Sequence, residues 1–138
     1  MPANPAPEVL SFTLPSEFDV LERVVAETER FLEERLPDED LAYRIVLLAT
    51  EAVTNAIEHG NRLDAAKQVR MELSVAPEHV DLWVEDEGGG FEPDRIDDPL
   101  DAENLLHTRG RGVYLIEQMA DEVRFEAGGR RVSMRFHR

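Results

Sequence analysis

Apolar and polar residues alternate in five short stretches of the chain, and each stretch predicts a β-strand with one buried face. Two of the stretches flank the turn at residues 77–79 and read as a hairpin with one apolar face. Two more flank Gly128 and Gly129, a tight turn. The predicted strands are residues 10–14, 69–75, 80–84, 123–125 and 132–136.

Between these strands, apolar residues recur at spacings of three and four, which predicts amphipathic helices. The first helix should begin after Ser16, as its N-cap, and run to about residue 36. Asp38 should cap a second helix over residues 39–59, and a third is predicted over residues 113–120. This order predicts an α+β fold: a two-layer α/β sandwich in which helices cover one face of a mainly antiparallel sheet.

The composition narrows the chemistry of the chain. Its 138 residues fit one domain, and we expect a folded part over residues 9–138 after a disordered leader at residues 1–8. The absence of cysteine excludes disulfides and thiolate metal sites, and no apolar run is long enough for a membrane span. A formal net charge of -15 argues against nucleic acid as a direct partner. A cytoplasmic bacterial protein is therefore expected.

The end of the second predicted helix carries the first candidate for chemistry. Residues 51–61 read Glu-Ala-Val-Thr-Asn-Ala-Ile-Glu-His-Gly-Asn, so Glu51, Asn55 and His59 share one helix face before Gly60 stops the helix. A carboxylate one turn before a carboxamide is suited to position a hydroxyl beside a metal-bound phosphate. The alternative interpretation is an ordinary solvated helix edge.

A second candidate lies where the hairpin ends. Asp86 follows the strand, and Gly88 and Gly90 follow Asp86. A carboxylate in this position can accept a hydrogen bond from an exocyclic amine, while the glycines let backbone approach a flat ligand. The alternative is a flexible exit from a strand into a loop.

The third candidate is Arg109-Gly110-Arg111-Gly112, just before the third predicted helix. Backbone N–H groups and the helix dipole favour a phosphate at such a position, and the arginines add positive charge to an acidic chain. The alternative is a loop-to-helix junction with solvated arginines.

The three segments together, in this order and spacing, resemble the Bergerat-fold ATP-binding domain of histidine kinases, DNA gyrase and the MutL proteins. The resemblance covers residues 9–138. Within that superfamily, residues 51–61 and 110–123 are similar to the anti-sigma-factor serine kinases, which are bacterial switch proteins. The resemblance implies binding of ATP and Mg²⁺, binding of a sigma factor, and phosphorylation of a serine on an anti-anti-sigma partner of the STAS fold.

The resemblance also implies roles for the matching residues. Asn55 would ligate Mg²⁺ through its carboxamide oxygen, and Glu51 would orient or deprotonate the attacking hydroxyl. Asp86 would accept a hydrogen bond from the adenine amine. Gly88 and Gly90 would line the adenine pocket.

The phosphates would lie near the third segment. Gly110 and Gly112 would cradle them, and Arg109 and Arg111 would contact them by position. Tyr114 stands where many relatives have a third glycine, which is a departure that affects phosphate approach.

Residues 91–109 would form a lid over the nucleotide. The lid is short and acidic, and we expect it to be mobile without a partner. His59 is interpreted as a helix-end residue favoured by the helix dipole rather than as a catalyst.

The leading hypothesis is therefore an ATP-dependent serine protein kinase that acts as an anti-sigma regulatory factor. The alternative is an ATP-binding module that shapes a protein interface without transferring phosphate. Trp83 falls on the polar face of its predicted strand and marks a candidate surface for a homodimer or another partner.

Overall fold

The computed structural model describes residues 7–88 and 108–138, with side chains from residue 112 onward in the second range. Within these ranges the strands are β1 (Glu8–Pro15), β2 (Gln68–Val75), β3 (His79–Glu85), β4 (Glu122–Glu126) and β5 (Arg131–His137). The α-helices are α1 (Leu21–Glu33), α2 (Glu39–Asn55) and α4 (Thr108–Met119).

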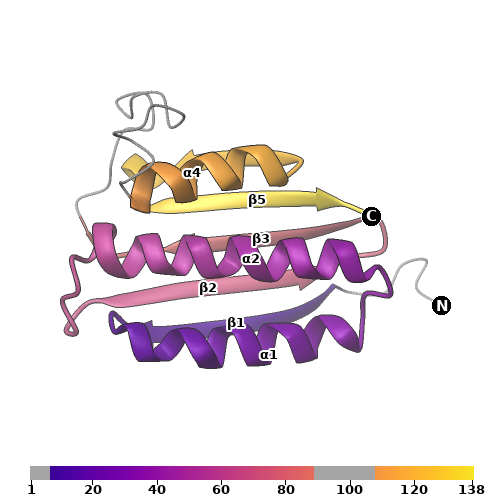
Figure 1. Cartoon of the computed structure of the whole chain (residues 1–138), viewed down its shortest axis with the longest axis horizontal. Coiled ribbons are helices and arrows are strands. Elements are labelled where there is room, and N and C mark those ends of the chain that lie inside the picture. The colour runs from indigo at the N-terminus through magenta and orange to yellow at the C-terminus, as the bar shows by residue number, and fades with distance from the viewer. Residues whose placement is uncertain (1–6, 89–107) are drawn as a thin grey trace.

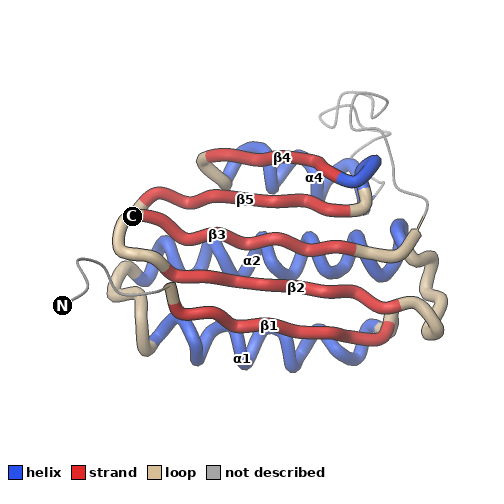
Figure 2. Tube along the Cα trace, turned by 180° about the vertical axis from the view of Figure 1, so that it is seen from behind, coloured by secondary structure: helices blue, strands red, loops and turns tan. Residues whose placement is uncertain are grey.

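The strands form one antiparallel sheet in the order β1-β2-β3-β5-β4. All three α-helices lie on the same face of this sheet, with α2 in the middle (Figure 1). Figure 2, from behind, shows the other face without a helical cover. The predicted α+β two-layer sandwich is confirmed.

The hydrophobic core lies between the two layers. Alternate strand side chains point toward the helices, and those of Leu73, Leu82 and Phe136 are almost completely buried. From the helical layer, Ile45 and Leu48 of α2 are equally inaccessible. Burial of each such side chain stabilises the fold by about 1.5–3 kcal/mol. The alternation that predicted the strands is thus the pattern of this core.

The uncovered face of the sheet is polar, and its charges pair across neighbouring strands. Asp81 of β3 accepts a hydrogen bond from Arg135 of β5 at 2.8 Å, and Glu85 accepts one from Arg131 at 2.7 Å. The Arg131 guanidinium also lies 4.1 Å from the centroid of the Trp83 ring. The sheet therefore has one buried and one solvated face, as antiparallel sheets commonly do.

The first helix begins later than predicted, because Ser16 is not its N-cap. Ser16 is buried, and its Oγ donates a hydrogen bond to the Lys67 carbonyl oxygen at 2.7 Å. The chain then makes a 3₁₀ turn at Phe18–Val20, and α1 begins at Leu21 and ends at Glu33. A long-range hydrogen bond thus replaces the local cap.

The second helix begins where predicted. Asp38 is its N-cap, and its carboxylate accepts a hydrogen bond from a first-turn backbone N–H at 3.0 Å. After Asn55 the backbone continues as a π-helix over Ala56–Gly60, closed by the Asn61 N–H donating to the Ala56 carbonyl at 2.8 Å. Apolar periodicity does not reveal this change of winding, which is common at functional sites.

The last helix, α4, begins at Thr108 rather than at residue 113. Its first turn holds no apolar residue, so the hydrophobic pattern places the start too late. Gly110 and Gly112 consequently lie within the first two turns of the helix. Among the helices that the structure describes, none has the length and apolarity needed to cross a membrane.

Candidate functional site

The three segments singled out in the sequence meet at one end of the molecule. In Figure 1 the C-terminal end of α2, the end of β3 and the start of α4 lie at the same end, and α4 packs on α2. Asn55, Asp86 and Gly112 are far apart in the chain, but the fold gathers them around one location.

Asp86 is held by close backbone contacts. It is 8% exposed, its N–H donates to the Arg130 carbonyl at 2.9 Å, and its Oδ1 accepts from the Gly88 N–H at 2.8 Å. A Cβ atom on Gly60 would lie 2.2 Å from Asp86 Oδ2, and one on Gly88 would lie 1.8 Å from the Gly60 carbonyl oxygen. Glycine is therefore required at both positions by close approach.

Asn55 lies at a close contact between α2 and α4. A Cβ atom on Gly112 would lie 2.6 Å from Asn55 Nδ2, so the last glycine of the third segment lets the two helices touch at this residue. The Asn55 Oδ1 atom is buried and has no hydrogen-bond partner within the described ranges. A buried oxygen without a partner destabilises a fold by about 1–3 kcal/mol. A carboxamide oxygen of this kind is a suitable ligand for a hard cation such as Mg²⁺.

Glu51 lies one helical turn before Asn55 on α2 and is half-buried. Its carboxylate makes no ion pair with the part of the chain that the structure describes. The structure thus leaves this carboxylate available beside Asn55, on the same side of the helix.

A cavity of about 30 Å³ lies between these elements. It is bordered by polar groups of Asn55 and Asp86 and otherwise mainly by apolar side chains, including Val84, Val113 and Ile116. This volume has room for about one or two water molecules. A purine ring fits there only when the surrounding groups separate, and α4 is the described element that packs against α2 across the site.

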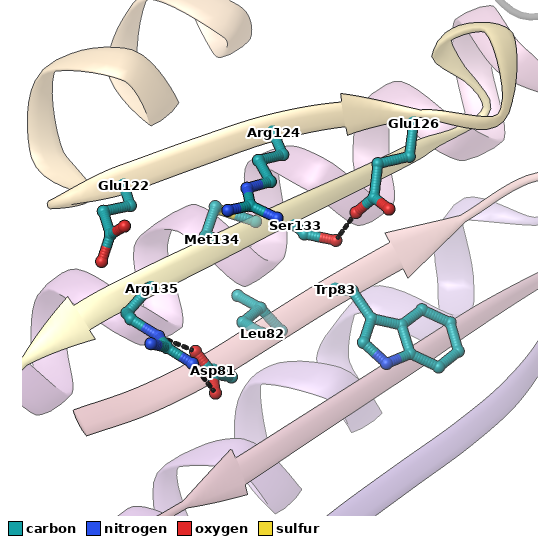
Figure 3. Close-up of a pocket in the computed structure, with 9 residues that line it drawn as sticks. All are labelled: Asp81, Leu82, Trp83, Glu122, Arg124, Glu126, Ser133, Met134 and Arg135. Atoms are coloured by element: carbon teal, nitrogen blue, oxygen red, sulfur yellow. Dashed lines mark hydrogen bonds and ion pairs between the residues drawn. The ribbon is translucent and has the colours of Figure 1, made fainter. Parts of the chain in front are cut away.

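A larger hollow, of about 270 Å³, lies on the uncovered sheet face (Figure 3). Its polar side chains largely satisfy one another: Arg135 donates to Asp81 at 2.8 Å, and Ser133 donates to Glu126 at 2.7 Å. Trp83 lies on this face, as the sequence predicted. The chemistry-bearing residues of the three segments are elsewhere, on the helical side of the sheet.

Several predicted site residues fall outside what the structure describes. Gly90 and residues 91–107 of the expected lid lie outside the described ranges. Arg109, Gly110 and Arg111 are described by their backbone alone, which is helical. Their contacts with phosphate, and the mobility of the lid, stay predictions.

Two further predictions concern residues near the site. Tyr114 is half-buried in α4, and its effect on phosphate approach stays a prediction. His59 lies in the π-helical turn with its Nε2 atom 3.9 Å from Glu58 Oε2, and its interpretation as a helix-end residue also stays a prediction.

Two features of the site are not apparent from the sequence. Gly60 is predicted only as a helix stop, whereas it packs against the Asp86 carboxylate. Asn61 has no predicted role, yet it is 1% exposed. A polar residue directly after a helix-ending glycine normally belongs to a surface connection, so no signal in the sequence marks Asn61 as buried.

Comparison with known proteins places this arrangement in a family. The family described as "Histidine kinase-like ATPase domain" matches residues 14–136. The serine-protein kinase RsbW of Bacillus subtilis (strain 168) is 31% identical over 86 residues, which cover 58% of this chain and 54% of that protein. The match therefore spans about half the length of that relative. The anti-sigma F factor of Oceanobacillus iheyensis is 29% identical over 116 residues, covering 83% of this chain and 78% of that protein.

A solved structure of the RsbU and RsbW domains of a Mycobacterium tuberculosis protein has the same fold. It superposes with a TM-score of 0.66 at 21% identity, covering 94% of this chain and 32% of that chain. The family match extends from the end of β1 to the end of β5 and includes every described residue of the site. The chain therefore belongs to the histidine kinase-like ATPase domain family.

Proposed function

We propose that the protein is an ATP-dependent serine kinase that acts as an anti-sigma regulatory factor. It binds ATP with Mg²⁺ at the site formed by α2, Asp86 and α4. It transfers the terminal phosphoryl group to a serine of a STAS-type anti-anti-sigma partner, and it sequesters a sigma factor. The similarity to proteins named serine-protein kinase RsbW and anti-sigma F factor supports this proposal.

One structural observation carries the proposal. The buried Asn55 Oδ1 atom has no hydrogen-bond partner within the described ranges, and it borders the same cavity as the buried Asp86. A fold tolerates an unsatisfied oxygen where a ligand completes its coordination. A cation ligand beside a buried carboxylate suits a nucleotide with a metal-bound phosphate chain.

Asp86 provides base recognition. An ionised carboxylate only accepts hydrogen bonds, so it pairs with the exocyclic amine of adenine and is mismatched to the carbonyl oxygen that guanine presents at the same ring position. The contact of Gly60 with Oδ2 and the Gly88 N–H bond to Oδ1 hold the carboxylate in a single orientation. A bound guanine would leave this buried carboxylate without a hydrogen-bond donor, and that loss is the basis of the discrimination.

Glu51 provides the base for transfer. Its position one turn before Asn55 places a carboxylate next to the proposed metal ligand, where it orients a serine hydroxyl and accepts its proton. Mg²⁺, when bound, neutralises phosphate charge and helps to align the phosphates. Asn55 holds that ion, and Glu51 acts on the incoming hydroxyl.

The test uses the purified protein with Mg²⁺, radiolabelled ATP and a cognate STAS protein. The expected result is transfer of label to a serine of the STAS protein. Glu51→Ala should lower the transfer rate about 100- to 10,000-fold while leaving ATP affinity within about twofold, because a general base acts on the hydroxyl and not on the nucleotide.

The matched control is Glu39→Ala. Glu39 is an exposed carboxylate on the same helix, in the first turn of α2, at the end remote from the site. This variant should transfer label at the wild-type rate. Tight ATP binding without any transfer in a single-turnover assay would contradict the kinase and identify an ATP-binding interaction module instead.

A further inference from the structure

The residue that follows the π-helical turn, Asn61, uses its whole side-chain amide inside the protein. It is 1% exposed. Its Nδ2 donates to Ser16 Oγ at 2.8 Å and to the Gln68 carbonyl oxygen at 3.0 Å. Its Oδ1 accepts a hydrogen bond from the Glu87 backbone N–H at 2.8 Å. Buried polar groups are costly unless paired, so these three bonds fix the side chain.

These bonds join three segments at the site end of the sheet. Ser16 directly follows β1, Gln68 begins β2, and Glu87 lies two residues past the end of β3. Glu87 is also the residue between Asp86 and Gly88. The Asn61 carboxamide therefore holds the middle of the turn that presents the Asp86 carboxylate.

Asn61 also belongs to the end of the α2 segment. Its own backbone N–H closes the π-helical turn by donating to the Ala56 carbonyl at 2.8 Å. The preceding residue, Gly60, packs against Asp86 Oδ2. Gly60 and Asn61 therefore contact the Asp86 turn from adjacent positions, one by close approach and the other by a hydrogen bond.

We propose that Asn61 is a positioning residue for base recognition: through its bond to the Glu87 N–H it sets the orientation of Asp86 toward the purine. The proposal rests on the proposed nucleotide site. The turn is also anchored by the Asp86 N–H bond to the Arg130 carbonyl and by the Gln68 N–H bond to Glu87 Oε1. Loss of the Asn61 bond therefore loosens the turn without releasing it, so ATP binds more weakly and adenine is distinguished less well from guanine. Phosphoryl transfer at saturating ATP is unaffected, because Glu51 and Asn55 lie on α2 itself.

The network supplies its own matched control. Ser16 Oγ accepts one bond from Asn61 and donates to the Lys67 carbonyl, and within the described ranges no hydrogen bond joins it to the Asp86 turn. Ser16→Ala therefore removes hydrogen bonds from the same buried network and leaves the bond from the Glu87 N–H to Asn61 Oδ1 in place. If Asn61 served only to stabilise the fold, Asn61→Ala and Ser16→Ala would both lower the stability of the protein and would change its ATP affinity equally.

The experiment compares the wild type with Asn61→Ala and Ser16→Ala. ATP and GTP affinities are measured by calorimetry, transfer by single-turnover kinetics, and amide exchange at Glu87 and Gly88 by NMR in the nucleotide-free protein. We expect Asn61→Ala to weaken ATP binding about tenfold, the factor for one such hydrogen bond, and to reduce the preference for ATP over GTP. The transfer rate at saturating ATP should stay within about twofold, and Ser16→Ala should keep wild-type affinity.

Amide exchange separates this inference from the function on which it rests. Faster exchange at Glu87 and Gly88 in Asn61→Ala, but not in Ser16→Ala, supports the positioning role whether or not ATP is bound. Unchanged exchange, or equal loss of ATP affinity in both variants, overturns it. Should Asn61→Ala fail to fold, amide exchange in the wild type still tests the inference, because a Glu87 N–H that donates to Asn61 Oδ1 exchanges slowly. Rapid exchange of the Glu87 amide in the wild type would also overturn the inference.

Discussion

The two sides of the sheet differ in how fully their polar groups are paired. On the uncovered face, Asp81 and Arg135 pair across β3 and β5, and the Arg131 guanidinium both bonds Glu85 and stacks on Trp83. On the helical side, Asn55 Oδ1 is buried without a hydrogen-bond partner in the described part of the chain. Both regions hold charged and polar side chains, but among the described residues the buried polar atoms without a hydrogen-bond partner include none on the uncovered face.

This difference shows where a ligand adds stability. Exposed ion pairs contribute about 0–1 kcal/mol each and have little further capacity to offer a ligand. A buried acceptor without a partner gains the full value of any cation or donor that reaches it. The helical-side site is therefore the better candidate for ligand binding, although its cavity of about 30 Å³ is smaller than the hollow of about 270 Å³ on the uncovered face.

The largest expected effect on ATP affinity comes from filling the contact between Gly60 and Asp86. In Gly60→Ala the new methyl group would lie 2.2 Å from Asp86 Oδ2, so the carboxylate has to move. Such overpacking costs about 2–3 kcal/mol, and we expect ATP affinity to fall roughly 100-fold. Isothermal titration with ATP measures this change.

The control for Gly60→Ala is Gly128→Asn. Gly128 has φ +67° and no atom within 4 Å of a built Cβ, and asparagine tolerates this backbone conformation. We expect wild-type ATP affinity in this variant. An equal loss of affinity in the two glycine variants would show that the Asp86 contact has no special role.

A smaller but more diagnostic effect is expected from Asn55→Ala. Removal of the unsatisfied Oδ1 should leave the free energy of unfolding of the nucleotide-free protein within about 1 kcal/mol of wild type. Affinity for ATP in the presence of Mg²⁺ should fall about tenfold or more, because a charge-assisted contact is lost. Denaturant unfolding and ATP titration with and without Mg²⁺ measure the two quantities.

The proposed difference between the two sides of the sheet would be contradicted if Asn55→Ala lost several kcal/mol of stability while its Mg²⁺-dependent affinity for ATP stayed unchanged. That outcome would make Asn55 a structural residue like those of the uncovered face. Thr54→Ala provides a neighbouring control, since the Thr54 hydroxyl already donates to the Thr50 carbonyl at 2.7 Å.

The smallest expected effect concerns the uncovered face and appears as a pH dependence. Partial burial alone would raise the pKa of Glu85, but hydrogen bonds and charge from Arg131 and Arg70 outweigh it and lower the pKa below the ordinary value of 4.5. A carboxylate with a lowered pKa in the folded state stabilises the protein above its unfolded-state pKa. That contribution disappears as the pH falls through the folded-state pKa.

The wild type should therefore be more stable than Glu85→Gln above pH 4.5, and the difference should shrink below that pH. Denaturant unfolding of both proteins across this range measures the difference. ATP affinity in Glu85→Gln should stay within about twofold of wild type, because the Glu85 carboxylate points to the uncovered face and pairs there. A difference in stability that grows as the pH falls would contradict the assignment.

Much of the fold is predictable from local patterns. Alternation of apolar residues locates all five strands within two residues at each end, and the Asp38 cap locates the start of α2. The errors fall where a distant partner overrides a local preference: Ser16 bonds Lys67 instead of capping a helix, and α4 begins in a turn without apolar residues. Local propensity is a weak prior that tertiary contacts readily displace.

The candidate site likewise has features that the sequence indicates and features that depend on tertiary contacts. The amino-acid sequence by itself singled out the candidate side chains for chemistry, Glu51, Asn55 and Asp86, because carboxylates, carboxamides and glycines are recognisable by type and spacing. Only the tertiary structure decided that Gly60 abuts Asp86, that Gly112 abuts Asn55 and that Asn61 bonds the Glu87 N–H. The physical reason is range: periodicity and capping act over a few residues, whereas these contacts join a side chain to backbone that the packed layers bring together from distant parts of the chain.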